Sequence, residues 1–183
     1  MKLSTLLIVL LMVMSSISSA AVPVTRLAVG DMLPPLRGEF LTGRPALLPQ
    51  AASAKVALLL LGFTYDSRFE VEAWTNAFRH EFEKNPNVTF YEIPMIGGMA
   101  RMGKWFIDGG MRRGTPKADQ EHVITVYGGT DPWKQRVGFS DPKAAYLILI
   151  DASGKVAWQC SGEFSEERYK ELSSQASRLL VGP

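Results

Sequence analysis

Two uninterrupted apolar stretches constrain the fold more than any other feature of the sequence. Residues 55–63 read KVALLLLGF, and residues 145–150 read AYLILI. Both are too short to cross a membrane, because a spanning helix needs about 20 apolar residues. Apolar runs of this length predict strands that are buried on both faces, in the centre of a sheet covered by helices. We therefore expect an α/β protein.

The remaining pattern alternates helices and strands. Strands separated by helices pair in parallel through right-handed crossovers, whereas a closing hairpin adds an antiparallel edge. The expected architecture is a mixed central sheet, mostly parallel with a C-terminal β-hairpin, flanked by helices. The expected elements are a helix at 68–84, a strand at 88–93 ended by Pro94, a glycine-interrupted helix at 95–111, a strand at 122–127, a helical turn at 133–137, a strand at 155–160 after a turn at 151–154, and a helix at 166–180 capped by Ser165.

The N-terminal residues are typical of an export signal. A weakly basic start precedes the apolar run LLIVLLMVM, and small residues at Ser18 and Ala20 predict cleavage after Ala20. An uncleaved anchor is the alternative, and the shortness of the run disfavours it. We expect a signal peptide at 1–20, a Pro- and Gly-rich extended lead-in at 21–54 and one domain at 55–183. The mature protein would be periplasmic or secreted, with no stable membrane span.

Charge and cysteine content exclude several classes of protein. The formal net charge is +2, which gives no electrostatic reason to expect nucleic acid as a partner. The chain contains one cysteine, Cys160, and two histidines, so an intramolecular disulfide and a Cys/His zinc cluster are both excluded. The sequence predicts no cofactor and no metal centre.

Several spaced motifs resemble those of the thioredoxin-like fold, and of its redoxin branch in particular. They are Val29-Gly30-Asp31-x-x-Pro34, Leu41-Thr42-Gly43-Arg44, and a closing strand, Asp-x-x-Gly turn, strand and helix at 145–180. The redoxin branch includes secreted thiol reductases, peroxiredoxins and Sco-type copper chaperones. The resemblance implies a redox loop after the first central strand and a substrate groove above that loop.

A narrower resemblance is to the mitochondrial ATP synthase assembly factor 10 family. It rests on Trp74-Thr75-x-x-Phe78, on Arg112-Arg113-x-x-Pro116 and, most specifically, on residues 146–172. The N-terminal segment differs from a mitochondrial presequence, which would be arginine-rich and amphipathic. The resemblance therefore implies a bacterial exported relative with a role in the assembly or stability of an envelope complex.

The expected redox loop lacks its thiols. Redox-active relatives carry Cys-x-x-Cys at a helix N-terminus, where the helix dipole stabilises the attacking thiolate. Here Asp66 stands at the position of the nucleophilic thiol, and Phe69 at that of its partner. A carboxylate cannot exchange disulfides, so we expect no thiol–disulfide activity. Acid catalysis by Asp66 with Glu70 and Glu72 is less favoured than a solvated first helical turn.

The same loop is the candidate partner-binding surface, because losing the thiols need not remove the groove. That surface comprises Tyr65, Asp66, Ser67, Arg68 and Phe69 with residues 143–145, including Ala145. Tyrosine and arginine are over-represented among binding hot spots. In the alternative, Phe69 packs under its own helix and Tyr65 covers the end of the sheet. If the partner binds elsewhere, the expected place is along Arg112, Arg113 and the glycine-rich segment before them. The leading prediction is an exported, non-catalytic protein that binds a protein partner.

Two sulfur-based alternatives remain open. Met95, Met99 and Met102 would share one face of the helix expected at 95–111, and thioethers select Cu(I), so a periplasmic copper-binding module is the runner-up function. The same spacing also fits a core stripe. Cys160 is expected to be a half-buried packing residue. An intermolecular disulfide or a redox sensor is the alternative, because exported thiols meet an oxidising compartment.

Overall fold

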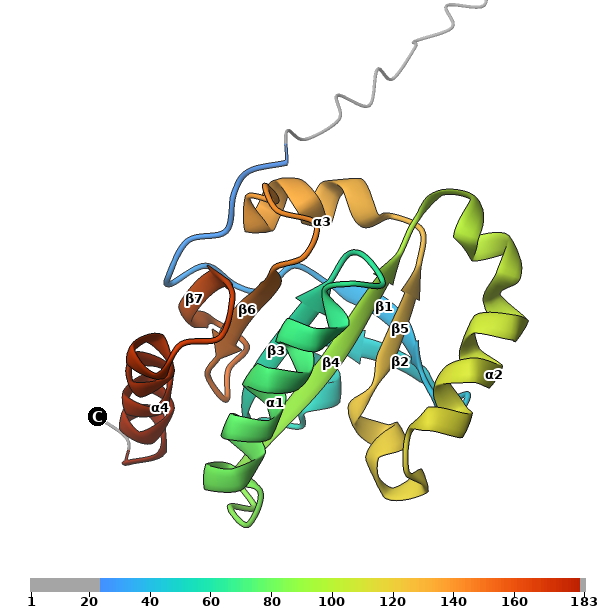
Figure 1. Ribbon diagram of the computed structural model, residues 1–183. Coiled ribbons are helices and arrows are strands. Elements are labelled where there is room, and N and C mark those ends of the chain that lie inside the picture. Colours follow the sequence, from blue (N-terminus) through green and yellow to red (C-terminus); the bar gives the residue numbers. More distant parts are fainter. Residues whose placement is uncertain (1–23, 182–183) are drawn as a thin grey trace, which may run out of the picture.

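Seven strands form one mixed sheet in the computed structural model, which describes residues 24–181 (Figure 1). The signal peptide expected at 1–20 lies outside the described residues. The strands are β1 (Leu36–Phe40), β2 (Pro45–Leu48), β3 (Val56–Gly62), β4 (Val88–Ile96), β5 (Ile124–Tyr127), β6 (Ala145–Ile150) and β7 (Val156–Gly162). The helices are α1 (Arg68–Phe82), α2 (Lys104–Gly114), α3 (Thr130–Val137) and α4 (Glu166–Val181), with 3₁₀ turns η1 (Gln50–Ala52), η2 (Gly98–Gly103) and η3 (Lys117–His122).

Strand β3 lies inside the sheet, as its apolar run predicts. The spatial order is β2-β1-β5-β4-β3-β6-β7, so β3 pairs with β4 on one side and β6 on the other. Leu58 and Leu60 pack into one hydrophobic cluster, while Leu59 and Leu61 pack into another on the opposite face. All four side chains are fully buried. Alternate side chains of a strand point to opposite faces, so both faces need a covering layer.

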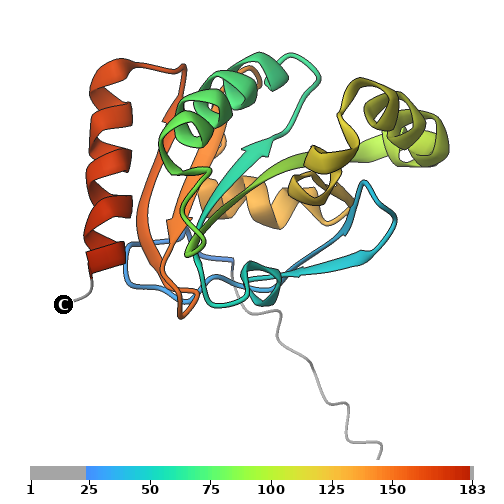
Figure 2. The ribbon, with the colours of Figure 1, turned by 90° about the horizontal axis from the view of Figure 1, so that it is seen from below.

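Different elements provide the two covering layers. Helices α1 and α4 cover one face through Trp74, Phe78 and Leu172, and Figure 2 shows these two helices on the same side of the sheet. Helix α3 and the lead-in cover the other face, with Trp133 and Leu33 in its core. The lead-in also supplies β1 and β2, so residues 24–54 share the core of the rest of the described chain.

Parallel pairing is less extensive than the sequence predicted. Only β3–β4 and β4–β5 are parallel, whereas β1–β2, β1–β5, β3–β6 and β6–β7 are antiparallel. The mixed sheet and the C-terminal hairpin are confirmed. The share of parallel pairs was overestimated because β6 enters beside β3 in the opposite direction and because β1 and β2 join the far edge as a hairpin.

Strand β4 continues past Pro94, contrary to expectation. Pro94 is the last β4 residue in register with β3, opposite Gly62, and the next residues pair with β5 instead. Proline cannot donate to a ladder, but here it sits where the pairing partner changes. Consequently the helix expected at 95–111 is wrong over its first half, since Met95 and Ile96 are strand residues and α2 begins at Lys104.

The predicted turn between β6 and β7 and the predicted cap of α4 are confirmed. Gly154 has φ +87°, and the Asp151 carboxylate accepts hydrogen bonds from the amides of Ser153 (2.8 Å) and Lys155 (2.9 Å) in the β6–β7 turn. Ser165 Oγ accepts the amide of Arg168 (3.3 Å), so it caps α4 as expected.

Candidate functional site

The candidate site lies at the edge of the sheet where β3 and β4 end and β6 begins. Strands β3 and β4 are parallel, so the loops that follow them leave the sheet at the same edge. Strand β6 is antiparallel to β3, with Tyr146 opposite Leu61, so residues 139–145 arrive at this edge too. The loop 63–67 therefore faces the segment before β6, as the fold resemblance implied.

Thr64 ties these two loops together, and sequence reasoning missed it. Its hydroxyl donates to the Pro142 carbonyl (2.5 Å), 78 residues away in sequence. Ser67 Oγ donates to the Thr64 carbonyl (2.8 Å), which closes a tight turn immediately before α1. A threonine three residues before a serine is a turn signal, but only the fold shows that its hydroxyl reaches Pro142.

An aromatic cluster supports the site from below. The ring of Phe63 lies 5.2 Å from that of Phe139 and 5.5 Å from that of Tyr146, both edge-on. The Tyr146 hydroxyl accepts the amides of Ser140 and Asp141, each at 2.9 Å. These ring contacts and hydrogen bonds join the loop 63–67 to the segment 139–145, so they help to position the exposed residues of the loop.

Arg68 lies between two exposed aromatic rings. Its guanidinium carbon is 3.5 Å from the centroid of Tyr65 and 4.4 Å from that of Phe69. Tyr65 is 77% exposed and Phe69 is 58% exposed. The alternative that Tyr65 covers the sheet end and Phe69 packs under its helix is therefore wrong. We call Tyr65, Arg68 and Phe69 the stacked triad.

The other expected site residues divide into exposed and buried residues. Asp66 is exposed beside the stacked triad. Ser67 and Ala145 are fully buried, so their side chains cannot form part of a binding surface. Ser67 is turned back into the loop by Thr64, and Ala145 packs in the core beneath α1 and α4. The exposed residues of the expected surface are thus the stacked triad, Asp66 and Lys143.

The acidic residues of the first α1 turn do not form an acid pair. Glu70 Oε2 accepts the amide of Phe164 (2.8 Å), which joins α1 to the segment leading into α4. Among residues 24–181, no cluster of three or more histidine, cysteine or acidic residues could hold a metal ion.

The methionine spacing does not produce a copper site. Met95 is buried in β4, whereas Met99 and Met102 are 84% and 83% exposed in η2. The three thioethers therefore do not share a helical face, and the copper-binding alternative loses its geometric basis. The core-stripe interpretation is also wrong for Met99 and Met102.

Cys160 is a half-buried residue of β7, in register with Leu147. Burial raises the pKa of its thiol to about 12, while Arg168 nearby lowers the pKa by a smaller amount. A protonated thiol is a poor nucleophile, so this environment fits the packing role rather than a redox sensor.

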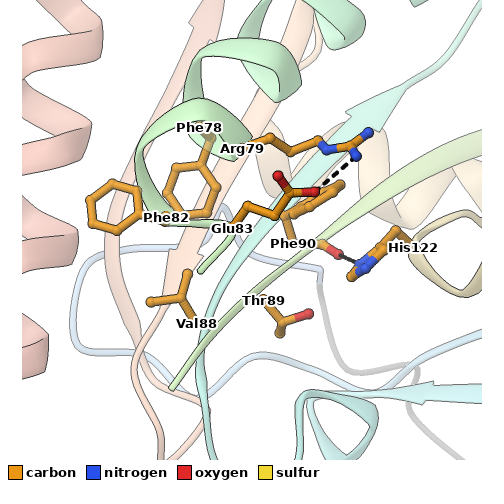
Figure 3. Close-up of a pocket in the computed structure, with 8 residues that line it drawn as sticks. All are labelled: Phe78, Arg79, Phe82, Glu83, Val88, Thr89, Phe90 and His122. Atoms are coloured by element: carbon orange, nitrogen blue, oxygen red, sulfur yellow. Dashed lines mark hydrogen bonds and ion pairs between the residues drawn. The ribbon is translucent and has the colours of Figure 1, made fainter. Parts of the chain in front are cut away.

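A hollow of about 60 Å³ lies between the end of α1 and β4 (Figure 3). His122 stacks on Phe90 with centroids 4.4 Å apart, and its Nδ1 lies 3.0 Å from the Phe90 carbonyl oxygen. Arg79 donates to Glu83 (3.1 Å) across the same hollow. Arg79 is paired with Glu83, His122 contacts the Phe90 carbonyl, and the volume of the hollow is small. We therefore assign the hollow a packing role.

Solved structures similar to this one include thiol–disulfide proteins and a thiol peroxidase. A candidate protein disulfide isomerase from Bacteroides thetaiotaomicron matches with a TM-score of 0.60 at 16% identity, covering 85% of this chain and 91% of that one. A candidate thiol:disulfide interchange protein DsbE from Chlorobium tepidum gives 0.57 at 16% identity, covering 84% and 99%. A thiol peroxidase from Chromobacterium violaceum gives 0.53 at 15% identity, covering 88% and 95%. Neither a protein-family model nor a curated protein matches the chain.

The chain therefore has a thioredoxin-like fold. Within that class it is a variant with one cysteine, Cys160, which lies in β7 rather than in the loop after β3. A disulfide-exchanging thiol pair cannot form within this chain. Among the helices of residues 24–181, none has the length and apolar content needed to cross a membrane.

Proposed function

We propose that this protein is a non-catalytic thioredoxin-like protein that binds a protein partner over the loop after β3. The observation that carries the proposal is the exposed stacked triad, which spans the end of the loop after β3 and the start of α1, where the fold resemblance implies the thiols of redox-active relatives. Apolar side chains that gather on an exposed surface often mark an interaction site. Tyr and Arg are also enriched among the residues that contribute most to binding energy.

The geometry of the triad defines the chemistry of the partner. A guanidinium that stacks on aromatic rings keeps its in-plane N–H groups available, so Arg68 can bind a carboxylate or backbone carbonyls in a bidentate manner. The two rings hold Arg68 in one orientation before binding, which lowers the entropy lost on association. The preferred partner segment therefore presents an acidic side chain or an extended backbone next to apolar side chains.

The sequence is the basis for the cellular location and the role that we propose. The N-terminal segment is typical of an export signal, so we propose that the protein acts outside the cytoplasm. We extend the proposal to a role in the assembly or stability of an envelope complex, which rests on the sequence resemblance of residues 146–172 to the ATP synthase assembly factor 10 family alone. Neither a family model nor a curated protein supports that resemblance. Loss of the thiols agrees with such a role, because holding a partner requires no electron transfer.

Capture of the partner tests the proposal. The tagged wild-type protein and a Tyr65→Ala/Arg68→Ala variant are used to isolate partners from the native envelope, and bound proteins are quantified by mass spectrometry. We expect the variant to recover at least tenfold less of the specific partner, since each hot-spot truncation costs about 1–2 kcal/mol and the variant carries two. The matched control is Met32→Ala/Arg37→Ala, which also removes one exposed apolar side chain and one exposed arginine.

Both substituted side chains are exposed, so the Tyr65→Ala/Arg68→Ala variant should fold like the wild type. The melting temperature of the Tyr65→Ala/Arg68→Ala variant should stay within about 2 °C of the wild type, since surface changes alter stability little. Equal recovery by this variant and the wild type would overturn the proposed surface.

A further inference from the structure

Helix α2 buries a charged residue, Asp108, and exposes two large aromatic side chains, Trp105 and Phe106. Asp108 is buried, and its carboxylate accepts hydrogen bonds from Lys104 Nζ (2.6 Å) and from the Tyr127 hydroxyl (2.7 Å). Lys104 also donates to Glu39 (3.0 Å), and Arg112 Nε donates to the Leu41 carbonyl (2.6 Å). Positions 104, 108 and 112 share one helical face, so charged groups attach this helix to β1 and β5.

Helix α2 and η2 also expose large apolar side chains. Trp105 is 86% exposed and Phe106 is 72% exposed, and the exposed Met99 and Met102 precede them in η2. Figure 1 shows α2 at the end of the sheet beside β5 and β1, apart from α1 and α4. A soluble helix normally buries its apolar face against the core. This one presents it to the surroundings, which marks an interaction surface.

The charge around this face favours an anionic partner. The sequence from 98 to 117 has five basic residues and one acidic residue, Asp108. Lys104 is paired with Asp108 and with Glu39, and the segment contains no other acidic residue to balance its remaining four basic residues. Arg113 and Lys117 are exposed, and neither has an ion-pair partner among residues 24–181. The next acidic residues, Asp119 and Glu121, are already paired with Arg79 and Arg44.

We propose that η2 and α2 dock on the surface of an anionic phospholipid bilayer. Tryptophan, phenylalanine and methionine can enter the boundary between head groups and acyl chains, while arginine and lysine remain among the anionic head groups. Each basic residue near such a surface contributes through its attraction to the lipid charge. This surface is separate from the stacked triad, so the proposal does not rest on the proposed function.

Fluorescence of Trp105 tests the proposal at the residue concerned. The full chain is mixed with vesicles of phosphatidylcholine containing phosphatidylglycerol, with or without brominated acyl chains. Trp74 and Trp133 are buried, and Trp158 is half-buried. The difference between the wild type and Trp105→Phe therefore isolates the signal of the exposed indole. We expect a blue shift and bromine quenching of that difference signal, both weaker in high salt or with phosphatidylcholine alone.

Two double variants separate the apolar and electrostatic contributions. Trp105→Ser/Phe106→Ser should lower vesicle partitioning about tenfold or more, because two large side chains no longer leave water. Arg113→Gln/Lys117→Gln should lower it about tenfold on anionic vesicles and leave binding to neutral vesicles unchanged. Val29→Ser/Met32→Ser removes two exposed apolar side chains elsewhere and is the matched control.

Three results would overturn the proposal. The first is a Trp105 signal that brominated anionic vesicles leave unchanged. The second is equal partitioning by Trp105→Ser/Phe106→Ser and by the wild type. The third is evidence that a protein covers this face of α2 while vesicles do not bind. Such evidence would be self-association of the chain, or capture of another protein, that is abolished in Trp105→Ser/Phe106→Ser.

Discussion

At the residue scale, Gly62 determines how closely the site loop approaches β3. A Cβ atom at this position would lie 2.7 Å from Ser67 Oγ and 3.4 Å from a methyl carbon of Val71. Ser67 is fully buried and hydrogen-bonded to Thr64, so it cannot move aside without loss. The glycine thus permits the turn that displays the stacked triad.

We predict that Gly62→Ala lowers the free energy of unfolding by about 1–3 kcal/mol through overpacking. Urea denaturation measures the change. In a Ser67→Ala background the penalty should be smaller, because the clashing oxygen is absent. Gly114→Ala is the matched control, since a Cβ there meets nothing within 4 Å, and this variant should be neutral or slightly stabilising. Equal effects at positions 62 and 114 would contradict the packing argument.

Cys160 gives a second residue-scale prediction. Burial raises its pKa from an ordinary value of 9.0 to about 12, so at pH 8 its thiolate fraction should be on the order of a thousandfold below that of an exposed thiol. Iodoacetamide should therefore label the native protein far more slowly than the protein in guanidinium. Fast labelling of the native protein would show that the thiol is accessible and reactive.

The raised pKa of Cys160 also makes the stability of the protein depend on pH. Because the folded state favours the protonated thiol, the contribution of Cys160 to stability is complete below pH 9 and is lost as the pH rises toward about 12. Cys160→Ser should weaken this alkaline decline in the free energy of unfolding. An identical pH dependence in the variant would contradict the assignment.

At the scale of elements, apolar patterns located the buried strands but not the outward-facing helix. The runs at 55–63 and 145–150 predicted β3 and β6 because strands buried on both faces need continuous apolar sequence. In α2 the same logic fails, because Trp105 and Phe106 are exposed and the buried side chain, Asp108, is charged. A hydrophobic pattern indicates a face of a helix but not what covers that face.

The polar attachment of α2 can be tested through Asp108. Asp108→Ala removes the carboxylate that accepts from the Tyr127 hydroxyl and from Lys104, which keeps only Glu39, so we expect a loss of about 1–3 kcal/mol. The loss should be local, seen by hydrogen exchange as lower protection in residues 98–114. Asp131→Ala is the control, because that carboxylate is exposed and lies 3.7 Å from Lys134. Unchanged protection of α2 in the Asp108 variant would contradict the polar attachment.

At the scale of the whole molecule, the sequence predicted the thioredoxin-like fold better than it predicted the site. Element order and turn chemistry depend on local residues, and they were sufficient for the sheet, α1 and the closing hairpin. The site depends on which side chains of one loop point outward. Ser67 and Ala145 proved buried, and the contribution of Thr64 was missed, because contacts across 78 residues leave no local pattern.

Reduction of insulin by dithiothreitol tests most directly the claim that this thioredoxin-like protein performs no thiol–disulfide chemistry. The rate of insulin precipitation is followed by turbidity with the wild-type protein, with Cys160→Ser, and with no added protein. We expect three equal rates, because Cys160 is half-buried and has no second thiol in the chain. A wild-type rate above the no-protein rate that disappears in Cys160→Ser would contradict the account.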